Sequence, residues 1–214
     1  MSLRVAVLIS GAGTNLQALL DTVHGRGGIE IVAVASSTAA AGGLARAERA
    51  GVETAVFPIA EHADRAARDR ALGDWLEERS VELVVLAGFM ELLDVGLVRR
   101  FAGRMINVHP ALLPAFPGVR AIEQAFDYGV KVMGVTVHFV DEGVDTGPII
   151  LQECFALPYS RDIGEIEHRA HAVEHRLLPR AVRLIAEGSV RIDERNPRLV
   201  HVEERGDVDQ RDDV

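Results

Sequence analysis

The chain has 214 residues, 48% of them hydrophobic, which is enough for a sizeable core and excludes global disorder. A net charge of −9, with no local cluster of Lys or Arg, argues against nucleic acid as the main partner. Because Cys154 is the one cysteine, it has no internal disulfide partner, and this suits a reducing compartment. The apolar run before Gly11 is too short for a signal peptide, and no stretch is long enough to span a membrane. We expect a cytoplasmic protein with no membrane partner.

Continuous apolar runs recur along the first half of the chain, at residues 4–9, 30–35, 53–57, 82–87 and 104–108. Runs without alternation are typical of parallel strands that are covered on both faces. Residues 15–20 are expected to form the first crossover helix. In a second helix, at 62–79, apolar residues keep a 3–4 spacing while Asp and Arg fill the other face. The pattern predicts a Rossmann-like α/β domain of three layers, αβα.

The pattern changes after residue 130. Val135, Val137 and Phe139 alternate with a more polar set, Thr136, His138 and Val140, which predicts a strand. The glycine-rich loop 141–147 then leads to a second strand at 149–155, where Cys154 is expected to be a buried small residue. The mostly parallel sheet should therefore end in an antiparallel hairpin. A helix is expected at 162–187, kinked or broken at Pro179. We expect one domain over 1–202 and a charged, flexible tail over 203–214.

The loop Ser10-Gly11-Ala12-Gly13-Thr14-Asn15 joins the first strand to the first helix. Glycines let the backbone approach an anion, and a helix N-terminus supplies free N–H groups, so a phosphate site is physically sensible. NAD is disfavoured because Leu16 replaces the third glycine and no acidic residue ends the second strand. The alternative is a tight turn with Thr14 or Asn15 as the helix N-cap.

Asn107 and His109 are the main candidates for chemistry. Strand alternation places both side chains on one face at the end of the run 105–109, and prolines stiffen the segment that follows. An amide beside an imidazole can polarise a carbonyl and move a proton. The alternative is a hydrogen-bonded Asn/His pair in the core.

A competing pattern lies in the last helix, where His171-Ala172-Val173-Glu174-His175 spells H-x-x-E-H. His171 and His175 share one helical face, as two zinc ligands would, and His168 lies one turn earlier. Pro179 and the lack of an acidic third ligand weaken this interpretation, and we expect no metal.

Four segments together resemble the phosphoribosylglycinamide formyltransferases (glycinamide ribonucleotide transformylases) of purine biosynthesis, which are folate-dependent formyltransferases. The segments are residues 10–18, 85–90, 106–118 and 134–148, the third containing Asn107-Val108-His109-Pro110. Related tRNA formyltransferases carry an extra carboxyl-terminal domain, and related hydrolases carry an amino-terminal regulatory domain. The length and the start of this chain are therefore expected to favour the glycinamide enzymes.

The resemblance implies roles for particular residues. On the ribonucleotide side it implies contacts from Gly13, Thr14, Asn15, His171, Ala172, Val173 and Glu174. On the folate side it implies contacts from Arg65, Phe89, Met90, Glu91, Leu92, Leu93, Asn107, Val140, Asp141, Glu142, Gly143, Val144 and Asp145. Glu91 departs from the family, which commonly has a basic residue there, so a side-chain contact from Glu91 is in doubt.

The implied reaction is direct attack of the glycyl amine of the ribonucleotide on the formyl carbon of 10-formyltetrahydrofolate. Asn107 and protonated His109 would donate hydrogen bonds to the oxyanion, and Asp145 would favour the charged imidazole. His138 is the rival of His109, while Asp141 and Glu142 are the rivals of Asp145. Both partners are small molecules, no metal is implied, and either a monomer or a homodimer is compatible with the sequence.

Three other functions stay open from the sequence. The first is another folate-dependent formyltransferase or a hydrolase of the same fold. The second is a non-catalytic nucleotide-binding module that uses only the glycine loop. The third is a zinc hydrolase that uses His171 and His175.

Overall fold

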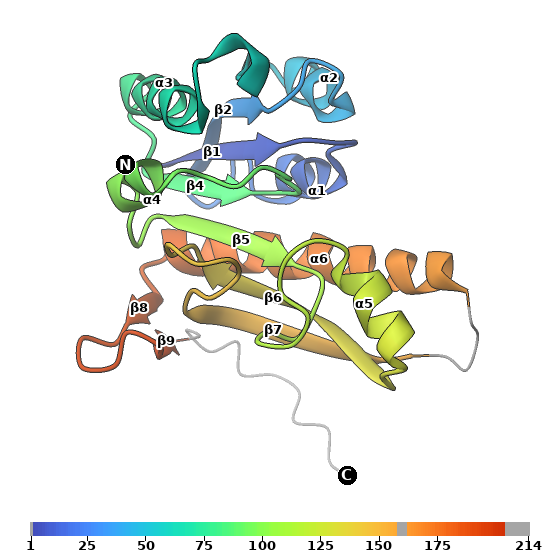
Figure 1. Ribbon diagram of the computed structural model, residues 1–214. Coiled ribbons are helices and arrows are strands. Elements are labelled where there is room, and N and C mark those ends of the chain that lie inside the picture. Colours follow the sequence, from blue (N-terminus) through green and yellow to red (C-terminus); the bar gives the residue numbers. More distant parts are fainter. Residues whose placement is uncertain (1, 158–161, 204–214) are drawn as a thin grey trace.

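A computed structural model describes residues 2–157 and 162–203 and contains a central seven-stranded sheet (Figure 1). The strands lie in the order β3-β2-β1-β4-β5-β6-β7. They are β1 (Leu3–Ile9), β2 (Ile29–Ser36), β3 (Glu53–Val56), β4 (Leu83–Leu86), β5 (Met105–His109), β6 (Val132–Phe139) and β7 (Ile149–Ala156). The first five strands pair in parallel, whereas β6 and β7 are antiparallel to their neighbours. The predicted mostly parallel sheet with a terminal antiparallel hairpin is confirmed.

The helices follow the expected alternation with the strands. They are α1 (Thr14–Thr22), α2 (Gly42–Arg49), the 3-10 turn η1 (Ile59–Glu61), α3 (Arg65–Glu78), α4 (Val95–Arg100), α5 (Ala121–Tyr128) and α6 (Ile163–Ala186). Helix α3 begins later than predicted because Asp64 caps it, with its Oδ1 accepting the N–H of Ala67 at 2.7 Å. Helix α6 continues through Pro179, so a break at this residue, one of the two predicted outcomes, is wrong.

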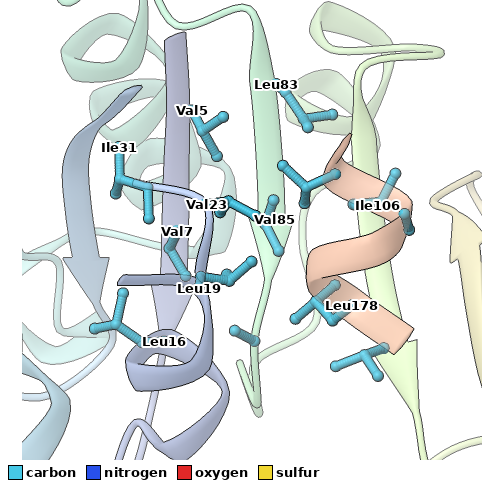
Figure 2. Close-up of a cluster of buried hydrophobic side chains, with 14 of the residues drawn as sticks. Val5, Val7, Leu16, Leu19, Val23, Ile31, Leu83, Val85, Ile106 and Leu178 are labelled. Atoms are coloured by element: carbon cyan, nitrogen blue, oxygen red, sulfur yellow. The ribbon is translucent and has the colours of Figure 1, made fainter. Parts of the chain in front are cut away.

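Helices cover both faces of the sheet. On one face Leu16 and Leu19 of α1 and Leu178 of α6 pack against strand residues that include Val7 and Val85 (Figure 2). On the other face the core is built by α3 and α4 together with Phe101. Residues 5–9 of β1 are buried between these layers, which explains why this part of the strand is a continuous apolar run.

Some expectations fail at the margins of the sheet. Cys154 is exposed rather than buried, because β7 is an edge strand whose side chains alternate between partial burial and exposure. Edge strand β3 is likewise only partly covered, unlike the prediction for 53–57. A second small sheet, β8 (Val190–Ile192) with β9 (Val200–Val202), was not anticipated. Apart from Glu203, the predicted tail at 203–214 lies outside the described residues.

Among the described helices, none has the length and apolarity needed to cross a membrane.

Candidate active site

Asn107 and His109 lie at the carboxyl end of β5, where antiparallel β6 places polar residues beside them. In the β5–β6 register Asn107 is opposite His138, and His109 is opposite Thr136. Asn107 is partly buried and His109 is buried, so the pair is largely shielded from water. The predicted side-by-side placement at a strand end is therefore present, with two further polar residues facing it from the next strand.

Two hydrogen-bond acceptors flank the His109 ring. Its Nε2 lies 2.8 Å from the carbonyl oxygen of Phe116, and its Nδ1 lies 3.3 Å from Oδ2 of Asp145. A neutral imidazole donates from one nitrogen only, whereas an imidazolium donates from both. The protonated ring is thus the form that satisfies both neighbours.

Asp145 reaches this ring from the loop after β6. Its backbone has φ 52°, in the left-handed region, and its Oδ2 also accepts the N–H of Gly118 at 2.7 Å. Burial alone would raise the pKa of Asp145. The hydrogen bonds from His138 and Gly118, together with the charge of His109, outweigh burial and lower the pKa below its ordinary value. Asp145 is therefore an ionised carboxylate beside the His109 ring.

The side-chain amide of Asn107 lies between two residues of the site. Its Nδ2 donates to Oδ1 of Asp145 at 3.2 Å and lies 3.2 Å from Nε2 of His138. Nδ1 of His138 lies 2.8 Å from the carbonyl oxygen of Phe139, so this nitrogen is the donor of that contact. Asp145 and His138 therefore hold the amide in place at the end of β5.

His138 is a site residue that the sequence interpretation undervalued. It is 2% exposed, and its Nε2 lies 3.5 Å from Oδ1 of Asp145. The available signal was the alternation of Thr136 and His138 on one face of the predicted strand. This alternation does not show which residues His138 will face. That follows only from the β5–β6 register, which places His138 opposite Asn107.

The other acidic residues of loop 141–147 have different partners. Oδ1 of Asp141 accepts from the N–H of Gly143 and the hydroxyl of Thr146, while Glu142 forms an ion pair with Arg99 on α4 at 2.7 Å. Of the three carboxylates in this loop, Asp145 is the one that contacts His109. The geometry thus favours Asp145 over its rivals.

The glycine loop is shaped by a close approach to α2. Gly13 is the N-cap of α1 with φ 72°, and a Cβ there would lie 2.5 Å from the Cα of Gly43. The alternative that Thr14 or Asn15 is the N-cap is therefore wrong. Thr14 is exposed at the start of α1, where first-turn N–H groups have no partner within the helix. Anion binding by this loop stays a prediction.

Asn15 is turned away from the loop toward the last long helix. Its Nδ2 donates to Oε2 of Glu174 at 2.8 Å, across 159 positions in the sequence, while its Oδ1 is buried with no hydrogen-bond partner. Glu174 is 6% exposed. Burial raises the pKa of Glu174, although the Asn15 hydrogen bond and the charge of His171 oppose this. The glycine loop and Glu174 thus form one contiguous polar region.

The rest of the H-x-x-E-H segment is arranged differently from a metal site. The rings of His171 and His175 stack with centroids 6.2 Å apart, Ala172 is exposed, and Val173 packs in the core. Within residues 2–157 and 162–203, no group of three or more His, Cys, Asp or Glu side chains is placed to hold a metal ion. Burial, followed by the charge of His171, lowers the pKa of His175.

Residues 88–94 connect β4 to α4 and contain five of the thirteen predicted folate contacts. Met90 and Leu92 are 75% and 53% exposed, whereas Phe89 and Leu93 pack partly against the core. Arg65 is exposed at the start of α3. Arg68, one turn later, is 1% exposed and contacts the segment directly, although the sequence pattern placed it on a solvent face. That part of the helix interpretation is wrong.

Replacing Glu174 with Gln is expected to stabilise the protein at neutral pH by about 2–4 °C in Tm, because a buried charge is replaced by a neutral amide. A carboxyl whose folded pKa is raised stabilises fully below its unfolded pKa and loses that contribution as pH rises through the folded value. The increase in Tm of the Gln variant over the wild type should therefore be small near pH 4 and grow toward pH 8. Thermal unfolding across this range checks it, and a gain independent of pH would contradict it.

Comparisons with known proteins agree with this geometry. The formyl transferase family model matches residues 3–182. A phosphoribosylglycinamide formyltransferase of Haemophilus influenzae is 40% identical over 190 residues, which are 88% of this chain and 90% of that protein. The crystal structure of glycinamide ribonucleotide transformylase 1 from Symbiobacterium toebii matches with TM-score 0.89 and 46% identity, covering 94% of each chain.

A longer relative matches as well. The trifunctional purine biosynthetic protein adenosine-3 of Bos taurus is 46% identical over 202 residues, or 94% of this chain, and the chain spans only 20% of that protein. The family match and the bacterial relatives of similar length carry the assignment. The chain belongs to the formyl transferase family, in the group of phosphoribosylglycinamide formyltransferases.

Proposed function

We propose that this protein transfers the formyl group of 10-formyltetrahydrofolate to the glycyl amine of 5-phosphoribosylglycinamide. The observation that carries the proposal is the 3.3 Å contact between His109 Nδ1 and Asp145 Oδ2 beside Asn107. Family membership supports a folate-derived formyl donor. The glycine loop with Glu174 is the region proposed to hold the ribonucleotide.

The proposed chemistry is direct addition of the amine to the formyl carbon. Electron density moves onto the formyl oxygen in the tetrahedral intermediate, and collapse of the intermediate breaks the bond to the folate nitrogen. The amine loses a proton and the folate nitrogen gains one. Imidazolium His109, held by Asp145, is suited to stabilise the oxyanion and to relay a proton between these groups. No side chain needs to act as a nucleophile.

Each proposed donor has an acceptor within the protein, so donation to the oxyanion is an exchange of partners. Nε2 of His109 faces the neutral carbonyl of Phe116, while Nδ2 of Asn107 lies 3.2 Å from both Oδ1 of Asp145 and Nε2 of His138. A negatively charged oxygen is a stronger acceptor than a neutral carbonyl. At His109 the exchange therefore favours the charged intermediate over the neutral formyl group, as differential binding requires.

The assay that tests the function follows folate absorbance with glycinamide ribonucleotide and 10-formyltetrahydrofolate as substrates. Transfer should require both compounds. Release of formate without the ribonucleotide would instead indicate a hydrolase of the same fold, and activity only with formate and ATP would reject the folate donor. Activity that disappears with a chelator and returns with zinc would favour the zinc alternative.

Substituting Gly13 with Ala is expected to raise KM for the ribonucleotide about tenfold, because the added Cβ collides with Gly43 and distorts the proposed phosphate loop. Gly25 is the matched control, since it also has positive φ but an added Cβ there meets nothing within 4 Å. Both variants should lose about 1 kcal/mol or more of stability from backbone strain. An equal rise of KM in both variants would reject the phosphate assignment.

A further inference from the structure

Helix α3 buries two oppositely charged residues that are consecutive in the sequence. Arg68 is 1% exposed and Asp69 is 0% exposed, and Nε of Arg68 lies 2.6 Å from Oδ1 of Asp69. The neighbouring buried positions Leu72 and Leu76 fill the same core with apolar side chains. Apolar residues would be sufficient for packing at positions 68 and 69. A protein with an apolar pair in place of a buried ion pair is often as stable as the original or more stable.

The unused hydrogen-bonding groups of this pair point at residues 88–94. Nη2 of Arg68 donates to the carbonyl of Leu92 at 3.1 Å, and Oδ2 of Asp69 accepts the N–H of Asp94 at 2.5 Å. The Arg68 guanidinium also lies 5.9 Å from the centroid of the Phe89 ring. The buried pair thus contacts a backbone carbonyl, a backbone N–H group and an aromatic ring of the segment.

The other end of the segment is fixed from the glycine loop. The N–H of Met90 donates to Oγ of Ser10 at 2.9 Å, and the N–H of Ser10 donates to the carbonyl of Gly88 at 3.1 Å. The backbone of the segment is therefore tied down along its length, while Met90 and Leu92 remain exposed on its outer side. A surface with fixed main-chain groups and adaptable apolar side chains suits a planar, hydrogen-bonding ring system.

Glu91 adds a feature particular to this chain. Nη1 of Arg68 is buried without a hydrogen-bond partner, and it lies 3.5 Å from Oε2 of Glu91. The exposed Glu91 side chain thus forms an ion pair with the buried guanidinium of α3, which gives the acidic residue at this position a structural partner.

We propose that the Arg68–Asp69 pair is a positioning device that holds residues 88–94 in the conformation that binds the ring system of the formyl donor. The proposal rests on the proposed function, because it takes a reduced folate as the ligand of this segment. The pair touches no reacting atom, so its effect should fall on donor binding and leave ribonucleotide binding and the chemical step nearly unchanged.

The test replaces the whole pair with apolar residues, Arg68→Met together with Asp69→Leu, so that no unpaired charge is left in the core. We expect Tm to be kept, KM for 10-formyltetrahydrofolate and the calorimetric Kd for tetrahydrofolate to rise about tenfold, and KM for the ribonucleotide to stay within about twofold. Arg70→Met, at an exposed position of the same helix, is the control and should match the wild type. A stable double variant with unchanged donor KM and Kd would overturn the proposal.

If the double variant fails to fold, Arg68→Lys decides the question. Lysine keeps the charge but lacks the planar guanidinium that donates hydrogen bonds to both Asp69 and the carbonyl of Leu92. A folded Lys variant should bind tetrahydrofolate about threefold more weakly, and unchanged binding would overturn the proposal. A wild type that binds tetrahydrofolate but transfers no formyl group would refute the proposed function alone, because the comparison of Kd values remains valid.

Discussion

Replacing His109 with Ala is expected to lower kcat about 1,000-fold while the fold persists. The variant removes both the charge proposed to face the developing oxyanion and the group proposed to relay protons between amine and folate nitrogen, two effects that together are worth about 1,000-fold. Because its ring is buried at the end of β5, the cavity will cost some stability, and circular dichroism should confirm that the secondary structure is retained.

Two controls separate chemistry from packing in this experiment. His168, exposed on α6, can be replaced by Ala and should leave kcat within about twofold. His109→Gln keeps a neutral donor of similar reach and should remain at least about 100-fold impaired, because the positive charge is gone. Near-normal turnover in the Ala variant would reject His109 as the centre of the mechanism.

The second large effect is expected for Asp145→Asn, with a loss of about 100–1,000-fold in kcat. The amide preserves the size of the side chain but removes the counter-charge of imidazolium His109, and it presents an N–H₂ group to donors such as Gly118. Steady-state kinetics with both substrates should show the loss in kcat more than in the KM for the ribonucleotide. Asp127→Asn, at an exposed position of α5, is the matched control.

The pH dependence of stability gives an independent check on Asp145. Because its folded pKa is lowered, the carboxylate stabilises the fold above its ordinary pKa of 3.8 and loses that contribution as pH falls through the lowered value. The stability difference between wild type and Asp145→Asn should thus shrink as the pH falls below about 4. A difference that stays the same in strong acid would show that the Asp145 carboxylate does not contribute in this way.

The features that sequence patterns predicted well are those set by local periodicity. Alternation along β5 puts Asn107 and His109 on one face whatever the rest of the chain does, and the continuous apolar run of β1 follows from burial between two helical layers. The contact between Asp145 and His109 was only implied by resemblance. It depends on the left-handed backbone at Asp145 and on the path of a seven-residue loop, neither of which has a periodic signal.

The features that were missed depend on which elements become neighbours. Arg68 and Asp69 look like the solvent face of a helix until residues 88–94 are packed over them, which converts polar residues into buried ones. His138 gains its partners only from the β5–β6 register. Cys154 lies on a strand as predicted but is exposed, because nothing in a single strand's sequence says that it will be at the edge of the sheet.

The buried hydrogen bond between Asn15 and Glu174 joins the first helix of the chain to the last long one. A contact between residues 159 positions apart can form only after most of the chain has been synthesised. The amino-terminal strands can pair long before α6 leaves the ribosome, yet the region proposed to hold the ribonucleotide stays incomplete until α6 docks. Occupancy of that region by substrate would therefore select finished chains and protect them from proteolysis, while nascent intermediates would gain nothing from it.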